Sequence, residues 1–161
     1  MSNDSIKQVI VMRTRYPDGK GGFFKPRTGK LIAQGAHASM AVLLRPQWSA
    51  LGYVVEETSP VDALVRLGPA PDQEPEVYLV GTTPDMREWL QGSFTKVCVQ
   101  VDSEEELRQI VAAAEAAKLP VALIEDLGRT EFHGVKTATC CAIGPAKAHD
   151  IDPITGHLRL L

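Results

Sequence analysis

Residues 6–12 read IKQVIVM, a short run in which β-branched and other apolar side chains dominate. Such a run is typical of a strand that is buried on both faces of a sheet. The chain then passes through glycine- and proline-rich residues and continues as KLIAQGAHASMAVLL, from Lys30 to Leu44, which has the length and composition of a helix. A buried strand followed by a helix predicts an α/β fold with residues 6–12 as a central strand.

The second half of the chain contains the remaining clear elements. We expect a strand over 94–101 and a helix from 103 to about 118, in which Ser103 and Glu106 match a capping box. Two further strands are expected in VALIED, 121–126, and KTATCCAIG, 136–144. The middle of the chain indicates a short helix that starts at Ser59, a strand in EVYLVG (76–81) and a short helix capped at Thr83. This order predicts a three-layer α/β/α fold with a mixed, mostly parallel sheet of about four to five strands.

The length of the chain, 161 residues, is enough for one domain, and we expect residues 1–161 to form it, with an elongated loop at 14–29 and an extended segment at 46–91. Apolar residues make up 44% and charged residues 23%, as in ordinary globular chains. The three cysteines form no C-x-x-C pair, which argues against a disulfide framework or a zinc site. We therefore expect a cytoplasmic protein without a metal or cofactor, and we expect neither a signal peptide nor a membrane span.

Charge is distributed unevenly along the chain. The net charge is −3, yet the segment from Lys7 to Lys30 carries seven cations and one acid. Such a local excess indicates an anionic partner, because electric fields act through clusters rather than totals. Aromatic residues at 16, 23 and 24 lie among these cations, where they either stack on unpaired RNA bases or anchor the loop to the core.

One candidate site lies on the helix over 30–44. At 100° per residue, Lys30, Gln34 and His37 fall on one stripe. Lys30 also lies in the first turn, where the helix dipole favours anions. The alternative is a polar face that is exposed to solvent. A phosphate-binding P-loop is excluded because Phe24 occupies the position of its first glycine and Leu31 follows Lys30.

The second candidate site is DLGRTE, from Asp126 to Glu131, directly after a predicted strand. The carboxyl ends of strands are where α/β folds build binding sites, and this segment offers two carboxylates, a guanidinium and a hydroxyl. The alternative is a simple turn around Gly128, in which Arg129 only pairs with a neighbouring glutamate.

Four blocks of the sequence, GKLIAQGAHA, DLGRTE, AIGP and DPITGHLRLL, together resemble the peptidyl-tRNA hydrolase type II family, which is typical of archaea and eukaryotes. The resemblance implies a compact α/β fold with a mixed sheet, commonly dimeric. It also implies hydrolysis of the ester that links a peptide to the 3′ end of tRNA, without a metal. The implied partners are tRNA and a second copy of the chain.

The resemblance extends to single positions of the two candidate sites. It implies that Lys30, Asp126 and Thr130 are catalytic. Residues expected to bind substrate are Gln34, His37, Arg129, Lys20, Lys25 and Arg27.

The chain departs from the family pattern in its longer loop at 14–29, in its longer segment at 46–91, and at Gly35 and Leu127. These departures leave open a non-catalytic tRNA- or ribosome-associated binding protein, or another small hydrolase, on the same fold.

Overall fold

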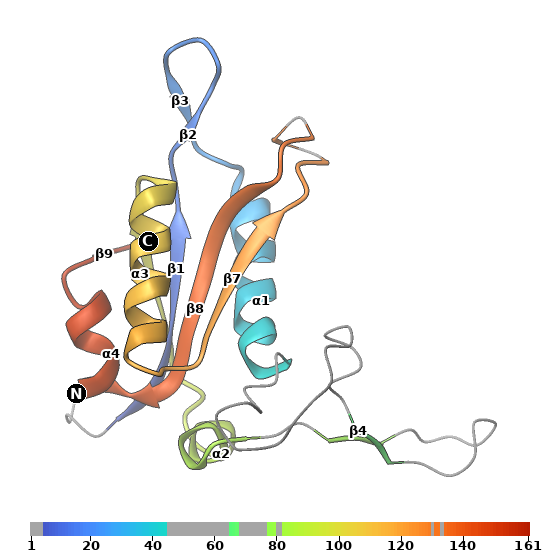
Figure 1. Ribbon diagram of the computed structural model, residues 1–161, viewed down its shortest axis with the longest axis vertical. Coiled ribbons are helices and arrows are strands. Elements are labelled where there is room, and N and C mark those ends of the chain that lie inside the picture. Colours follow the sequence, from blue (N-terminus) through green and yellow to red (C-terminus); the bar gives the residue numbers. More distant parts are fainter. Residues whose placement is uncertain (1–4, 45–64, 68–76, 80–81, 130, 133) are drawn as a thin grey trace.

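A computed structural model describes residues 5–44, 65–67, 77–79, 82–129, 131–132 and 134–161. Its centre is a five-stranded sheet with the strand order β7-β8-β1-β6-β9 (Figure 1). The bounds of these strands are β1 (Ile6–Arg13), β6 (Lys96–Val101), β7 (Val121–Asp126), β8 (Thr137–Lys147) and β9 (Arg159–Leu160). The predicted central strand, α/β class and strand number are confirmed.

The sheet is mixed, as expected, but the prediction that it is mostly parallel is wrong. Among the described strands only β1 and β6 pair in parallel, whereas β8 runs antiparallel to both β1 and β7, and β9 runs antiparallel to β6. The reason is the connection between β7 and β8, which is a loop, and a parallel pair would need a longer crossover.

Three layers result because α1 (Thr28–Leu44) covers one face of the sheet and α3 (Glu104–Ala116) and α4 (Ala148–Thr155) cover the other (Figure 1). Alternate residues of β1 serve the two faces: Val9 and Val11 belong to the cluster under α3 and α4, and Ile10 and Met12 to the cluster under α1. No helix in the described ranges is both long and apolar enough to cross a bilayer.

The predicted helix starts are confirmed at two positions. Ser103 caps α3 by accepting a hydrogen bond from the backbone N–H of Glu106 at 3.1 Å, and the Glu106 carboxylate accepts one from the N–H of Asp102 in return. Thr83 caps α2 (Pro84–Gln91) by accepting a hydrogen bond from the N–H of Met86 at 3.1 Å. Local side-chain chemistry thus sets where both helices begin.

The segment expected as a loop at 14–29 contains a small hairpin, formed by β2 (Tyr16–Pro17) and β3 (Phe23–Phe24). Asp18 closes its turn, because its Oδ1 accepts hydrogen bonds from the backbone N–H groups of Lys20 and Gly22, each at 2.8 Å. The hairpin projects from one end of the molecule (Figure 1).

The middle of the chain is described only in part. β5 (Val77–Leu79) confirms the strand expected there, and it pairs with β4 (Val65–Leu67). The prediction of a helix from Ser59 is wrong at 65–67, where the backbone pairs with β5 as a strand. The other residues of that predicted helix lie outside the described ranges. The extended segment 46–91 and the single domain stay predictions. The elements α4 and β9 were not anticipated.

Candidate functional site

The two candidate sites of the sequence meet in space. Lys30, in the first turn of α1, forms an ion pair with Asp126, the last residue of β7. Gln34, one turn further along α1, donates a hydrogen bond from Nε2 to Oδ2 of the same carboxylate at 2.8 Å. The predicted stripe on the helix therefore faces the predicted strand end, and Asp126 joins them.

The carboxylate of Asp126 is fixed from a third side by its own loop. The backbone N–H of Gly128 donates to Asp126 Oδ1 at 2.7 Å. Gly128 has a φ of +78°, and a Cβ there would lie 2.6 Å from the backbone N and O of Val135, so this tight turn requires glycine. The turn is thus part of the site, rather than an alternative to it.

Asp126 is ionised in this setting. Burial raises the pKa of its carboxyl, but the hydrogen bonds from Lys30, the Gly128 N–H and Gln34, with the charge of Lys30, outweigh burial and hold the pKa below its ordinary value. A carboxylate with a lowered pKa is a poor proton acceptor and a good fixed negative charge.

Gln34 is only 5% exposed and its amide is held at both ends. Thr139, in β8, donates its hydroxyl to Gln34 Oε1 at 2.7 Å, and the same hydroxyl lies 3.2 Å from the carbonyl oxygen of Ile124. This contact sets which way the amide points, so that Nε2 faces Asp126. Sequence reasoning missed Thr139, whose one signal was a hydroxyl within a largely apolar strand.

Aromatic residues enclose the other side of Lys30. Its Nζ lies 5.7 Å from the ring centroid of buried Phe132, which packs against Tyr16 with a centroid distance of 4.8 Å and against Phe24 at 6.1 Å. For Tyr16 and Phe24 the structure therefore favours anchoring of the loop. Phe23 differs, because it is exposed.

A cleft of about 280 Å³ opens over this cluster. Its lining includes Lys30, Gln34, Asp126 and two exposed residues predicted to bind substrate, His37 and Arg129. Thr130 lies outside the described residues, so its catalytic role stays a prediction.

The three remaining predicted binding residues are not in this cleft. Lys20 is exposed in the turn of the hairpin, and Lys25 and Arg27 line a separate cleft of about 670 Å³ beside Phe132. Arg27 donates from Nε to Glu131 Oε1 at 2.8 Å, so it is tied to the loop that follows Asp126.

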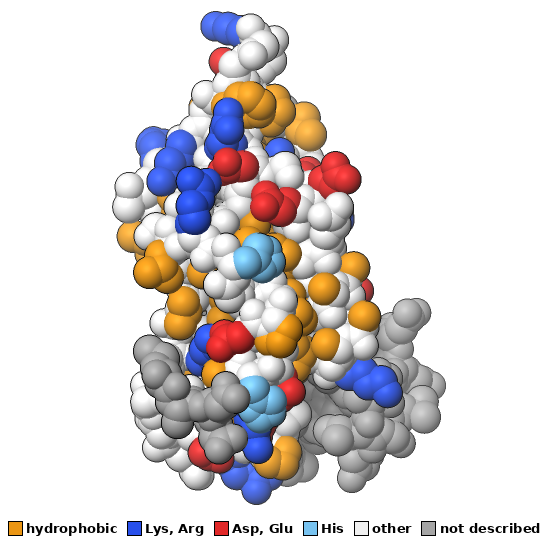
Figure 2. Space-filling view, turned by 90° about the vertical axis from the view of Figure 1, so that its left-hand side faces the viewer, with side chains coloured by type: hydrophobic (Ala, Val, Ile, Leu, Met, Phe, Trp, Pro, Cys, Tyr) orange, Lys and Arg blue, Asp and Glu red, His pale blue; other side chains and the backbone are white. Residues whose placement is uncertain are grey.

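The cluster of seven cations is more divided than its sequence indicates. Lys7 pairs with Asp152, and buried Arg13 pairs with Glu104 at 2.9 Å, so both stabilise the fold. Figure 2 shows blue Lys and Arg side chains gathered toward the hairpin end of one face, with red carboxylates beside them. Among the residues that the structure describes, no group of three or more His, Cys, Asp or Glu side chains is placed to hold a metal.

Comparison with known proteins identifies the family. The family model described as "Peptidyl-tRNA hydrolase PTH2" matches residues 6–161. The chain belongs to this family.

Similar members include "Peptidyl-tRNA hydrolase" of Methanocaldococcus jannaschii, 34% identical over 97% of this chain and 100% of that protein. "Peptidyl-tRNA hydrolase" of Saccharolobus islandicus is 31% identical over 97% of this chain and 99% of its own length. "Probable peptidyl-tRNA hydrolase 2" of Drosophila melanogaster is 33% identical over 99% of this chain, which spans 63% of that protein.

The contact between Thr139 and Gln34 gives a testable positioning role. Thr139→Val should lower kcat for peptidyl-tRNA about tenfold with little change in KM, because Gln34 loses the partner that orients its amide. Thr139→Ser keeps the hydroxyl and should restore most of kcat. A loss of kcat in Thr139→Ser with normal kcat in Thr139→Val would mean that the packing of the methyl group matters and the hydroxyl does not.

Proposed function

We propose that this chain hydrolyses the ester between a peptide and the 3′ end of tRNA in the cleft over Lys30, Gln34 and Asp126. One observation carries the proposal: a lysine and a glutamine from α1 converge on a single carboxylate at the end of β7, beside a cleft. Membership of the peptidyl-tRNA hydrolase family supports the reaction.

Ester hydrolysis needs a positioned water and a stabiliser for the oxyanion of the tetrahedral intermediate. Lys30 supplies the second requirement. An ammonium has three N–H donors, so pairing with Asp126 is compatible with donation to the substrate's carbonyl oxygen. Because the Lys30 side chain is only 16% exposed, its charge acts in an environment where electrostatic stabilisation is stronger than in water.

Asp126 contributes mainly as a fixed anion. Its lowered pKa makes it a weak general base, whereas its contacts fix the Lys30 ammonium and the Gln34 amide. We propose that it also accepts a hydrogen bond from the attacking water. Thr130 is proposed as a second water contact, and His37 and Arg129 as contacts of the tRNA end at the cleft's rim.

Hydrolysis is favoured over binding without turnover by the chemistry of the cluster. Removing a lysine and a carboxylate from water costs free energy, and an apolar pair would stabilise the fold as well or better. A partly buried ion pair at a cleft is therefore better explained by a role in the reaction. We also propose that the chain forms a homodimer, binds RNA and acts in the cytoplasm. The family resemblance supports the homodimer and the RNA, and the free cysteines support the cytoplasm.

The purified protein should release free tRNA from peptidyl-tRNA catalytically, as followed by separation of the two species on a gel. Binding of tRNA should weaken steeply with salt, because cations that contact phosphates release counterions. Binding without release would instead support the non-catalytic alternative.

A further inference from the structure

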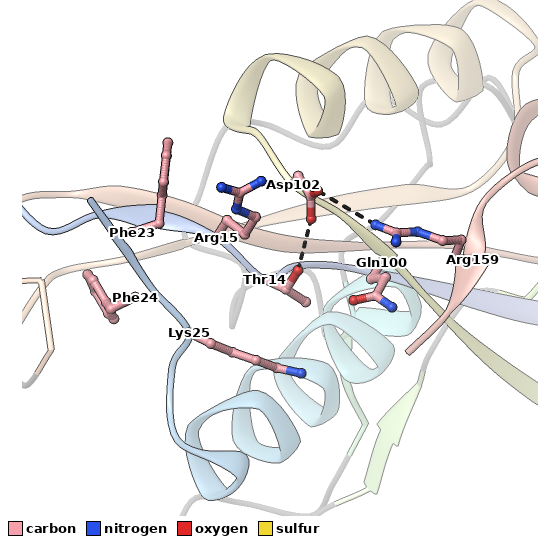
Figure 3. Close-up of a pocket in the computed structure, with 8 residues that line it drawn as sticks. All are labelled: Thr14, Arg15, Phe23, Phe24, Lys25, Gln100, Asp102 and Arg159. Carbon is pink, nitrogen blue, oxygen red and sulfur yellow. Dashed lines mark hydrogen bonds and ion pairs between the residues drawn. The ribbon is translucent and has the colours of Figure 1, made fainter. Parts of the chain in front are cut away.

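A further cleft lies where the parallel strands β1 and β6 end, beside the hairpin (Figure 3). It has a volume of about 550 Å³ and shares no lining residue with the cleft over Asp126. The lining residues that bear on its chemistry are Arg15, Phe23, Lys25, Asp102 and Arg159. They come from three distant parts of the chain, so the fold assembles this group.

The charge of the cleft favours an anion. Two guanidinium groups approach Asp102 from opposite sides in Figure 3: Arg15 lies 3.7 Å and Arg159 3.6 Å from its Oδ2. Both distances exceed the 2.7–2.9 Å that is typical of a charge-assisted hydrogen bond. Lys25 is a third, exposed cation in the lining, so the cleft is lined by three positive groups and one carboxylate. Guanidinium groups that are loosely held in this way can form forked contacts with a phosphate.

The same cleft offers an aromatic surface. Phe23 is 58% exposed, and the guanidinium of Arg15 lies 4.4 Å from its ring centroid. Its neighbour Phe24 packs against the Tyr16 and Phe132 rings instead. An exposed large aromatic ring beside a guanidinium is the combination on which unpaired bases stack.

We propose that this cleft binds a nucleotide of the single-stranded acceptor end of the substrate tRNA, with its phosphate between Arg15 and Arg159 and its base on Phe23. This proposal rests on the proposed function and places the part of the acceptor end that lies beyond the reacting ester. The ligand is single-stranded RNA because stacking needs an unpaired base, whereas phosphate contacts alone would serve a duplex equally well.

The cleft lies within reach of the reaction centre. Lys25 lines both this cleft and the one that contains Arg27 and Phe132, and Lys30 follows five residues later. Five residues span at most about 18 Å. Phosphates in a stacked strand are about 3.4 Å apart along the axis, so no more than about five nucleotides separate the two sites.

Substitution of Asp102 should strengthen RNA binding, whereas loss of the cations or of Phe23 should weaken it. The Asp102 carboxylate competes with a phosphate for Arg15 and Arg159, so Asp102→Asn should tighten RNA binding several-fold. The substitution keeps Oδ1, which accepts a hydrogen bond from Thr14 at 3.4 Å, and it leaves the backbone contact to Glu106 in place.

Arg159→Ala should weaken binding about tenfold and reduce the salt slope by about one phosphate contact. Phe23→Ala should weaken binding about tenfold, and Phe23→Leu should not restore it.

The experiment measures the affinity of each variant for a fluorescent single-stranded RNA oligonucleotide at several salt concentrations, and kcat and KM for peptidyl-tRNA. Arg87→Ala, which removes an exposed cation of α2, is the matched control and should behave as the unmodified protein. We expect Arg159→Ala and Phe23→Ala to raise KM in proportion to the loss of RNA affinity, with kcat unchanged.

Two results separate this inference from the proposed function. If the unmodified protein hydrolyses peptidyl-tRNA, and Arg159→Ala, Phe23→Ala and Asp102→Asn all bind the oligonucleotide like Arg87→Ala, the cleft is not an RNA site and hydrolysis stands. If the unmodified protein releases no tRNA but binds the oligonucleotide with the expected dependence on these residues, the RNA site stands and the hydrolase function falls.

Discussion

Asp126→Asn is expected to lower kcat for peptidyl-tRNA by at least about 100-fold. Asparagine has nearly the same shape, but it has a single acceptor oxygen, so the change removes the negative charge and one of the two oxygens that accept hydrogen bonds from Gly128 and Gln34. Without that charge the Lys30 ammonium is no longer fixed in place, and the attacking water loses its anionic acceptor. The measurement is single-turnover hydrolysis with saturating enzyme, which separates the chemical step from binding.

The pH dependence should reveal how Asp126 acts. Because its folded-state pKa is lowered, it stays ionised through the neutral range, and we expect no titration of Asp126 in kcat between about pH 5 and 8. The lowered pKa also contributes to the free energy of unfolding. That contribution is present above the unfolded pKa of about 3.9 and is lost as the pH falls through the folded pKa. The stability difference between the unmodified protein and Asp126→Asn should therefore shrink in acid.

Asp152→Asn is the matched control for this change, because Asp152 is also a carboxylate paired with a lysine, Lys7, but belongs to α4. It should leave kcat near that of the unmodified protein. Comparable turnover in Asp126→Asn and Asp152→Asn would remove Asp126 from the reaction. A fall in kcat near neutral pH that Asp126→Asn abolishes would instead identify Asp126 as a general base.

The positions of the main site residues can be predicted from the sequence, because they depend on local geometry. The helical repeat places Lys30 and Gln34 on one stripe whatever the tertiary structure, and the strand end places Asp126 at an edge where loops meet. The contact between them needed only that α1 cover the end of β7. The family resemblance supplied the roles of these residues, which periodicity alone did not give.

The parts that sequence reasoning missed depend on pairings between distant residues. Thr139 reaches Gln34 only because β8 lies between β1 and β7 in the sheet, and the sequence does not show which strands become neighbours. The count of cations in the sequence missed distant pairings in the same way. Arg13 belongs to the basic segment of the sequence, yet Glu104, ninety-one positions away, pairs with it inside the protein. Composition cannot tell a buried cation from an exposed one.

Lys30→Met should lower kcat by about 100- to 1,000-fold, the range found when one group that stabilises an oxyanion is removed. Methionine keeps much of the length and apolar character of the lysine stem, so contact with Phe132 persists while the charge is lost. If Lys30 acts on the oxyanion, kcat falls and KM changes little; if it holds a tRNA phosphate, KM rises and kcat persists. We expect the first result, and for Lys25→Met the second, because Lys25 lines the proposed RNA cleft.

Loss of Lys30 should also raise the pKa of Asp126, because the lysine lowers that pKa both by its hydrogen bond and by its charge. The shift can be followed by NMR titration of the carboxyl carbon. If the pair acts as one unit, Lys30→Met/Asp126→Asn should lose about as much activity as the more damaged single variant, since either substitution alone already disables the ammonium. Multiplicative losses would mean that Lys30 and Asp126 serve separate steps of the reaction.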